Sequence, residues 1–175
     1  MRKSILSTLL VGTSLIAANY SGIIEAPDAS EIIKKDLLPQ PQAYTMPSSC
    51  NLNDPAAIKR GEYFFHGLNG DETKIDPPDG VSRKYSSNGK VKQYGNCVAC
   101  HNIEGAVGAG NIGPDLTNYK STFVDSGVRN NAFVYQKIAD PRVDNSNTRM
   151  TINLTTKLFN EQEICDLTAY VIAKK

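Results

Sequence analysis

The segment Cys97-Val98-Ala99-Cys100-His101 decides how this chain is interpreted. Two cysteines three positions apart lie about one helical turn from each other, so both thiols can reach the same edge of a planar macrocycle. A histidine directly after the second cysteine can bind the central metal from one side. This C-x-x-C-H spacing is the signature of c-type haem attachment. The sequence therefore predicts one covalent haem c held by Cys97 and Cys100, with His101 as an iron ligand.

Two other chemistries use closely spaced cysteines, and the surrounding sequence favours neither. A thioredoxin-like redox pair would need a βαβ context, which the flanking loops and predicted helices do not supply. A structural zinc site needs four ligands at paired spacing. The chain has only two histidines, His66 and His101, and its other cysteines, Cys50 and Cys165, lie far away in sequence.

The iron needs a second axial ligand or an open position, and Met150 is the preferred candidate. It follows His101 by 49 residues and stands in a polar loop between two predicted helices, where packing gives little reason for a methionine. Met46 lies in a proline-rich segment. His66 is the rival ligand, but a histidine at a helix end is more typical of a solvated or capping residue.

A ligating histidine usually donates its other N–H group to a carbonyl. The Gly113-Pro114 turn follows His101 closely enough for the carbonyl of Pro114 to serve. An ordinary loop turn is the alternative interpretation of these two residues.

The N-terminal residues 1–18 are typical of a cleaved secretory signal, with Arg2 and Lys3 before an apolar stretch that ends in small residues. An uncleaved anchor is the alternative. No later segment is apolar enough to cross a bilayer, so we expect a periplasmic protein without a membrane span. The mature chain has 17 basic and 18 acidic residues, a net charge of −1, which argues against nucleic-acid binding.

In an oxidising compartment the remaining pair, Cys50 and Cys165, is most simply a disulfide. Two separate buried thiols are the alternative. The expected organisation is a signal peptide at 1–18, an N-terminal extension at 19–49 and one folded domain at 50–175.

The patterning predicts an all-α domain with long loops. A short helix is expected at 31–38, and Asp54 with Pro55 begins a helix that runs to His66. A long polar loop covers 67–95, and a helical turn carries the cysteines. Another helix spans 131–139 with Asn131 as its cap, and a capping box at Asn160 and Glu163 starts the last one.

Gly61 and Phe65 in the first long helix, with Asp166 to Tyr170 in the last, resemble the crossing helices of the class I cytochrome c fold. Within that fold the chain resembles SoxX, the monohaem subunit family of the SoxAX thiosulfate-oxidising cytochromes. Four segments carry this likeness: 95–101, 110–116, 138–142 and 145–150. Two features depart from the family: Thr151 stands where proline usually follows the methionine, and the 67–95 loop is longer.

The resemblance implies a division of labour. A SoxA-like cytochrome subunit would join thiosulfate oxidatively to a carrier-protein cysteine, as an L-cysteine S-thiosulfotransferase. This chain would accept the electrons and pass them to a downstream cytochrome, without catalytic residues of its own. The alternatives are a free-standing periplasmic electron carrier and a cytochrome subunit of another dehydrogenase.

Overall fold

The computed structural model describes residues 38–67, 76–81 and 95–173. The predicted signal peptide, the helix expected at 31–38 and most of the 67–95 loop lie outside these residues. The described residues belong to one compact unit, Leu38–Lys175. They form helices and turns without any strand, which confirms the all-α prediction for this part of the chain.

Helix α2 spans Pro55–His66 and begins as the sequence predicts. The carboxylate of Asp54 accepts hydrogen bonds from the N–H groups of Ala56 and Ala57, at 3.0 and 3.3 Å. An N–H group at the first helical position would have no partner within the helix. Proline has no N–H group, so Pro55 fits this position without losing a hydrogen bond. Three aromatic side chains of this helix are buried in the core: Tyr63, Phe64 and Phe65.

Helix α4 spans Glu161–Val171, and its capping box has both bonds, from Glu163 N–H to Asn160 and from Asn160 N–H to Glu163. Helix α3 spans Asn131–Ala139 as expected, but Asn130 and not Asn131 is its N-cap. The side chain of Asn130 accepts from the N–H of Phe133 at 2.8 Å, which places the cap one residue earlier than predicted.

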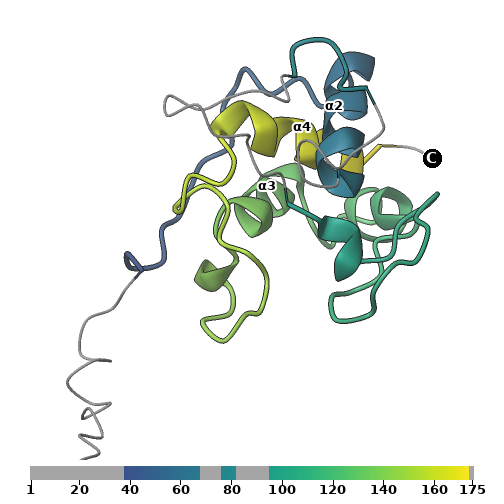
Figure 1. Ribbon diagram of the computed structural model, residues 1–175. Helices are drawn as coiled ribbons and strands as arrows, with labels where there is room; N and C mark the ends of the chain where they lie inside the picture. Colours follow the sequence, from purple (N-terminus) through teal and green to yellow (C-terminus); the bar gives the residue numbers. More distant parts are fainter. Residues whose placement is uncertain (1–37, 68–75, 82–94, 174–175) are drawn as a thin grey trace, which may run out of the picture. The chain divides into compact units, whose positions relative to one another are not determined.

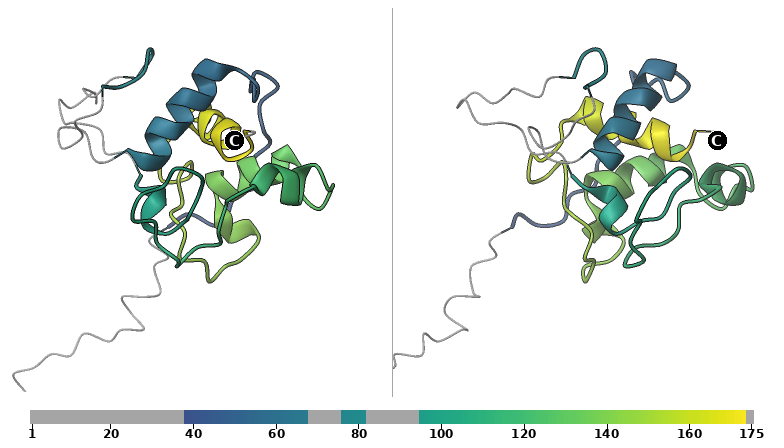
Figure 2. Two further views of the ribbon diagram at one scale, coloured as in Figure 1. Left: turned by 90° about the vertical axis from the view of Figure 1, so that its right-hand side faces the viewer. Right: turned by 45° about the vertical axis from the view of Figure 1, so that its right-hand side comes forward.

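Helices α2 and α4 cross in direct contact, with α3 packed against α4 (Figures 1 and 2). The crossing depends on Gly61, because a Cβ atom there would lie 2.0 Å from the carbonyl oxygen of Asp166 and 2.7 Å from Cβ of Tyr170. Glycine alone lets the two backbones approach this closely. Gly61 therefore lies on the face of α2 that packs against α4, and the next residue, Glu62, is exposed to solvent.

Three short turns complete the described structure: η2 at Cys97–Ala99, η3 at Lys120–Val124 and η4 at Pro141–Val143. The first is the helical turn expected at the cysteines. The sequence interpretation did not predict η3 or η4. None of the helices in the described ranges has the length and apolarity required to cross a bilayer.

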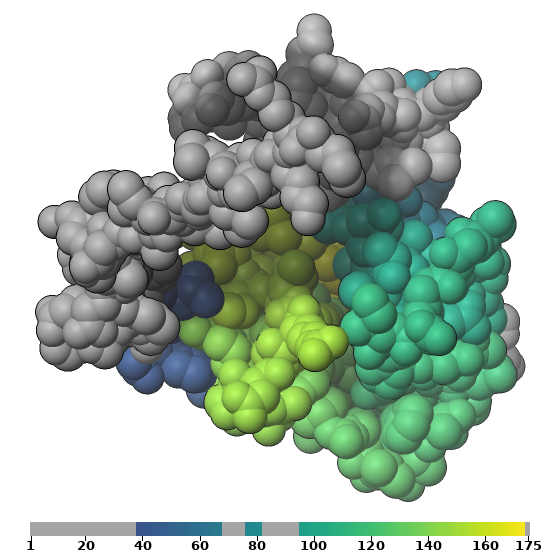
Figure 3. All heavy atoms as spheres, turned by 60° about the horizontal axis from the view of Figure 1, so that its bottom comes forward, coloured from purple at the N-terminus to yellow at the C-terminus, as the bar shows by residue number. Residues whose placement is uncertain are grey.

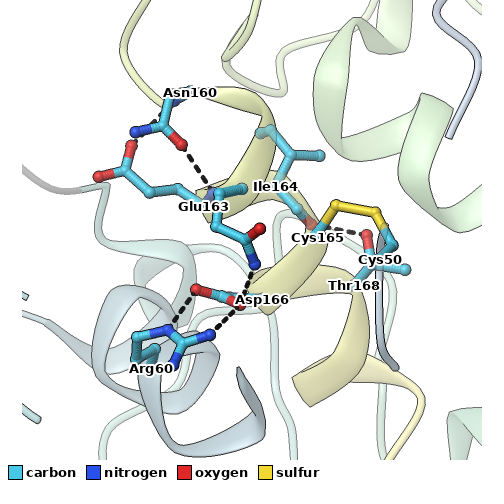
Figure 4. The surroundings of a disulfide bond; sticks show 9 residues. Cys50, Arg60, Asn160, Glu163, Ile164, Cys165, Asp166 and Thr168 are labelled. Carbon is cyan, nitrogen blue, oxygen red and sulfur yellow. Dashed lines mark hydrogen bonds and ion pairs between the residues drawn. A yellow bond between two sulfur atoms is a disulfide. The ribbon is translucent and has the colours of Figure 1, made fainter. Parts of the chain in front are cut away.

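Cys50 and Cys165 form a disulfide, with their Cα atoms 5.4 Å apart (Figure 4). On the same helix as Cys165, the buried carboxylate of Asp166 makes a two-pronged ion pair with Arg60 of α2. Its oxygens lie 2.7 Å from Nε and 2.9 Å from Nη2 of Arg60. Bonding to Asp166 raises the pKa of Arg60, so this link between α2 and α4 is a charged one.

Residues 38–49, the last part of the extension expected at 19–49, pack on the domain. Tyr44 and Met46 are partly buried against the hydrophobic core. The backbone of this segment bonds to the end of α3, with Gln42 N–H donating to Asp140 at 3.2 Å. The compact unit thus begins at Leu38, about twelve residues before Cys50.

Candidate haem site

The C-x-x-C-H segment folds into the short turn η2, with Cys97 as its first residue and Cys100 as its C-cap. The N–H groups of Cys100 and His101 both donate to the carbonyl of Cys97, at 3.1 and 3.0 Å. Both cysteines are half-buried thiols that take no part in a disulfide. Two free thiols one turn apart provide the pair of nucleophiles that covalent haem attachment requires.

The environment of Cys97 argues against a thioredoxin-like redox role. Burial, with a smaller contribution from the neighbouring Cys100, raises the pKa of the Cys97 thiol to about 12. Redox-active C-x-x-C pairs work through a thiolate whose pKa is lowered. The Cys97 thiol therefore lacks the activation that such a redox role requires.

The imidazole of His101 is held in one orientation by the Gly113-Pro114 turn. Its Nδ1 atom lies 2.8 Å from the carbonyl oxygen of Pro114. A carbonyl can only accept, so Nδ1 carries the proton and the lone pair of Nε2 remains for a metal. A Cβ atom on Gly113 would lie 2.3 Å from Cε1 of His101, so the backbone of this turn lies directly against the ring.

The loop after His101 folds back onto the cysteine turn. Gly110 N–H donates to the carbonyl of Val98 at 2.9 Å, and Gly113 N–H donates to that of Cys100 at 2.8 Å. At position 110 a Cβ atom would meet the carbonyl oxygen of Ala99 at 1.9 Å. This close approach requires glycine and keeps Pro114 beside His101.

Met150 comes from a separate loop, between η4 and α4. Its side chain is partly buried against the hydrophobic core, and its N–H donates to Thr148 Oγ1 at 3.1 Å. In Figure 3 the yellow-green segment that contains this loop and the teal segment that follows η2 face each other, with the surface hollowed between them. The structure thus joins Cys97, Cys100 and His101 in one hydrogen-bonded turn, sets Pro114 against His101 and keeps Met150 on a second loop.

The two rival ligands have other partners. His66 is not the solvated or capping residue expected from the sequence, because its Nε2 lies 2.7 Å from the hydroxyl of Tyr170. Met46 lies in the proline-rich segment, as the sequence indicates, and packs partly buried against the core. Neither residue is on the loops that carry His101 and Met150.

The residues present fit a c-type haem. They supply two free thiols on one turn and an imidazole whose Nδ1 is fixed by Pro114, and a methionine stands on a second loop. Within the described ranges no cluster of three or more histidine, cysteine, aspartate or glutamate side chains could hold a metal ion, so a structural zinc site finds no support there. The arrangement defines a covalent haem site of the class I type.

Comparison with known families leads to the same class. The family model "Cytochrome c" matches residues 86–173, 88 of the 175 residues, so the chain belongs to the cytochrome c family. The protein is thus a c-type cytochrome with the all-α class I fold, and it carries covalently bound haem c. Searches of curated proteins and of solved structures returned no match.

Proposed function

We propose that this cytochrome is the electron-accepting monohaem subunit of a SoxAX-like complex, which conjugates thiosulfate to a cysteine of a carrier protein. The observation that supports this most is where the segments resembling SoxX lie. Segment 110–116 folds over the cysteine turn and positions His101, and segments 138–142 and 145–150 form the loop that carries Met150. The likeness thus falls on the parts of the chain that surround the haem site.

Each site residue has a defined role in this proposal. Cys97 and Cys100 would hold the haem through thioethers, and His101 and Met150 would ligate its iron. Pro114 accepts a hydrogen bond from Nδ1 of His101 and so leaves Nε2 as the nitrogen that would bind iron. When bound, the haem supplies one-electron iron chemistry. A thioether ligand favours the ferrous state and raises the reduction potential, which suits an electron acceptor.

The cysteines support placing bond formation on a partner subunit. The sequence contains four cysteines. Cys50 and Cys165 are joined in a disulfide, and haem attachment uses Cys97 and Cys100. No thiol then remains that could carry sulfur or ligate the iron, so thiosulfate conjugation would need a thiolate from elsewhere.

The surface beside the haem motif suits a protein partner. Val107 is 91% exposed and Ile112 is 69% exposed, and both lie on the loop that folds over the cysteine turn. Large apolar side chains this exposed are typical of an interaction site when they occur together. We propose that the partner covers this loop together with Val98 and residues 149–151.

Export to the periplasm is part of the same proposal. It rests on the signal-like residues 1–18 and on the Cys50–Cys165 disulfide, because stable disulfides are typical of oxidising compartments. Haem c and an electron-carrying role suit such a compartment as well.

Changing Met150 tests the axial ligation. Met150→Ala should lower the reduction potential and open the iron to carbon monoxide and cyanide, because the thioether is lost. Axial ligand choice moves haem potentials over a range of about 0.8 V, so the shift should exceed experimental error. Potentiometry and ligand titration measure both effects. Met46→Ala is the matched control and should leave the potential and the ligand affinity unchanged. If Met46→Ala changes both and Met150→Ala changes neither, Met46 is the ligand.

The complex itself is tested by purification from the native source. We expect the chain to co-purify with a cytochrome subunit that contains a cysteine-ligated haem. Thiosulfate conjugation should require that subunit and the carrier protein, and the purified chain alone should show none. A chain that purifies as a lone monomer and exchanges electrons equally well with unrelated partners would instead be a free electron carrier.

A further inference from the structure

The Met150 loop, residues 140–153, leaves the end of α3 and returns to the same place. The carbonyl of Ala139 accepts hydrogen bonds from the N–H groups of Asn153 and Leu154, at 3.1 and 2.9 Å. The buried side-chain amide of Asn153 donates to the carbonyl of Ile138 at 2.8 Å. The loop is therefore closed at its base, whereas its residues 143–147 are exposed.

A buried carboxylate reinforces this base. Asp140, at 0% exposure, accepts from Thr155 Oγ1 at 2.7 Å, so the first residue of the loop bonds to a residue just beyond its end. Asp140 also accepts from Nε and Nη2 of Arg142, at 3.0 and 2.8 Å. The guanidinium of Arg142 holds the pKa of Asp140 far below its usual range, so the carboxylate stays charged.

A distant part of the chain, residues 39–44, lies across this base, and we name it the strap. Gln42 N–H donates to Asp140 at 3.2 Å. The carbonyl of Pro39 accepts from Nη1 of Arg142 at 2.7 Å. The hydroxyl of Tyr44 lies 3.0 Å from Oγ1 of Thr155. The strap thus contacts residues at the start of the loop and just beyond its end.

Gln136 of α3 joins the strap to the helix. Its side-chain amide donates to the carbonyls of Gln42 and Asp140, at 3.3 and 3.0 Å, and its Oε1 accepts from Tyr44 N–H. The two bonds between Gln136 and the strap connect residues more than ninety positions apart in sequence. They belong to one polar network that includes both the strap and the base of the Met150 loop.

We propose that the strap is a positioning element that fixes the base of the Met150 loop and so governs how firmly the Met150 thioether binds the iron. This inference rests on the proposed ligation by Met150. A loop with an exposed tip depends on its base for its conformation, since its tip makes few contacts that could hold it. Tyr44 and Gln42 act through the loop and do not touch the iron.

The test uses the full-length holoprotein with Gln42→Pro and Tyr44→Phe combined, which removes the donor to Asp140 and the hydroxyl beside Thr155. Imidazole must displace Met150 to bind ferric iron, so a loosened loop should bind imidazole more tightly. We expect about a tenfold lower dissociation constant, which corresponds to about 1.4 kcal/mol. Tyr44→Phe alone keeps the ring and should give about a threefold change, as for one hydrogen bond.

Asp54→Ala is the matched control, because the Asp54 side chain caps α2 through Ala56 and Ala57, away from the Met150 loop in sequence. Its imidazole affinity should equal that of the wild type. Equal affinity in the strap variants and the wild type would overturn the inference, as would equal tightening in Asp54→Ala. If the strap variants match the wild type, Met150→Ala shows which proposal has failed. Wild-type imidazole affinity in Met150→Ala would mean that Met150 is not the ligand. Tighter binding in Met150→Ala would mean that Met150 is the ligand and that only the role of the strap is wrong.

Discussion

Replacing both Cys97 and Cys100 with alanine should abolish covalent haem retention. Thioether bonds survive denaturation, so the wild-type protein should keep its colour on a denaturing gel, whereas the double variant should keep none. The two thiols lie on the single turn η2, and Cys50 and Cys165 are already bonded to each other. No other thiol of the chain could replace the lost links. Haem staining of the gel measures the result directly.

The matched control for this experiment is the Cys50→Ala/Cys165→Ala variant, which also loses two cysteines. It should keep its haem on the same gel, with or without a reducing agent. If acid and organic solvent extract haem from the wild-type protein, the haem is not covalently bound and the role of Cys97 and Cys100 is wrong. Haem that stays with the Cys97→Ala/Cys100→Ala protein would contradict the assignment equally.

Loss of the Cys50–Cys165 disulfide should greatly lower the free energy of unfolding. The bond joins residues 115 positions apart and ties the segment before α2 to the middle of α4. In the chain-entropy model, a loop of this length stabilises the folded state by about 4 to 5 kcal/mol, mainly by restricting the unfolded chain. That is a large share of the roughly 5 to 15 kcal/mol typical of a folded domain.

Denaturant unfolding of the Cys50→Ala/Cys165→Ala variant measures this loss. Its midpoint should fall well below that of the wild type, and a reducing agent should lower the wild-type midpoint without affecting the variant. The haem should remain attached in every sample. Equal midpoints for variant and wild type under oxidising conditions would show that the bond contributes little, and peptide mapping with both thiols free would show that it does not form.

The helices could be predicted from sequence because their signals are local. Asp54 with Pro55, and Asn160 with Glu163, are capping patterns within four residues, and both helices begin where these patterns lie. The assignment of Asn131 as a cap was wrong by one position because Asn130 and Asn131 are adjacent and equally suited. Asp140 before Pro141 is a similar pattern that could have revealed η4.

The contacts of the strap could not be predicted, because they depend on tertiary packing. Pro39, Pro41 and Pro47 break any periodic pattern, so the segment resembles a tail. Its bonds to Asp140 and Gln136 connect residues more than ninety positions apart. The pairing of His66 with Tyr170 was missed for the same reason, at a separation of 104 residues. The haem motif could be recognised from the sequence because its cysteines and histidine lie within five residues. Ligation by Met150 stays a prediction.

The disulfide also changes what a single peptide-bond cut does to this protein. The chain from Cys50 to Cys165 is a closed covalent cycle, and both haem cysteines, His101 and Met150 belong to it. One proteolytic cleavage anywhere within the cycle opens it but releases no fragment. Nicked protein should therefore migrate as one coloured species until a reducing agent is added. Unless the cut lies between Cys97 and Cys100, where the two thioethers would still join both pieces to the haem, the protein should then separate into two pieces, with all of the haem on the piece that contains the cysteine turn.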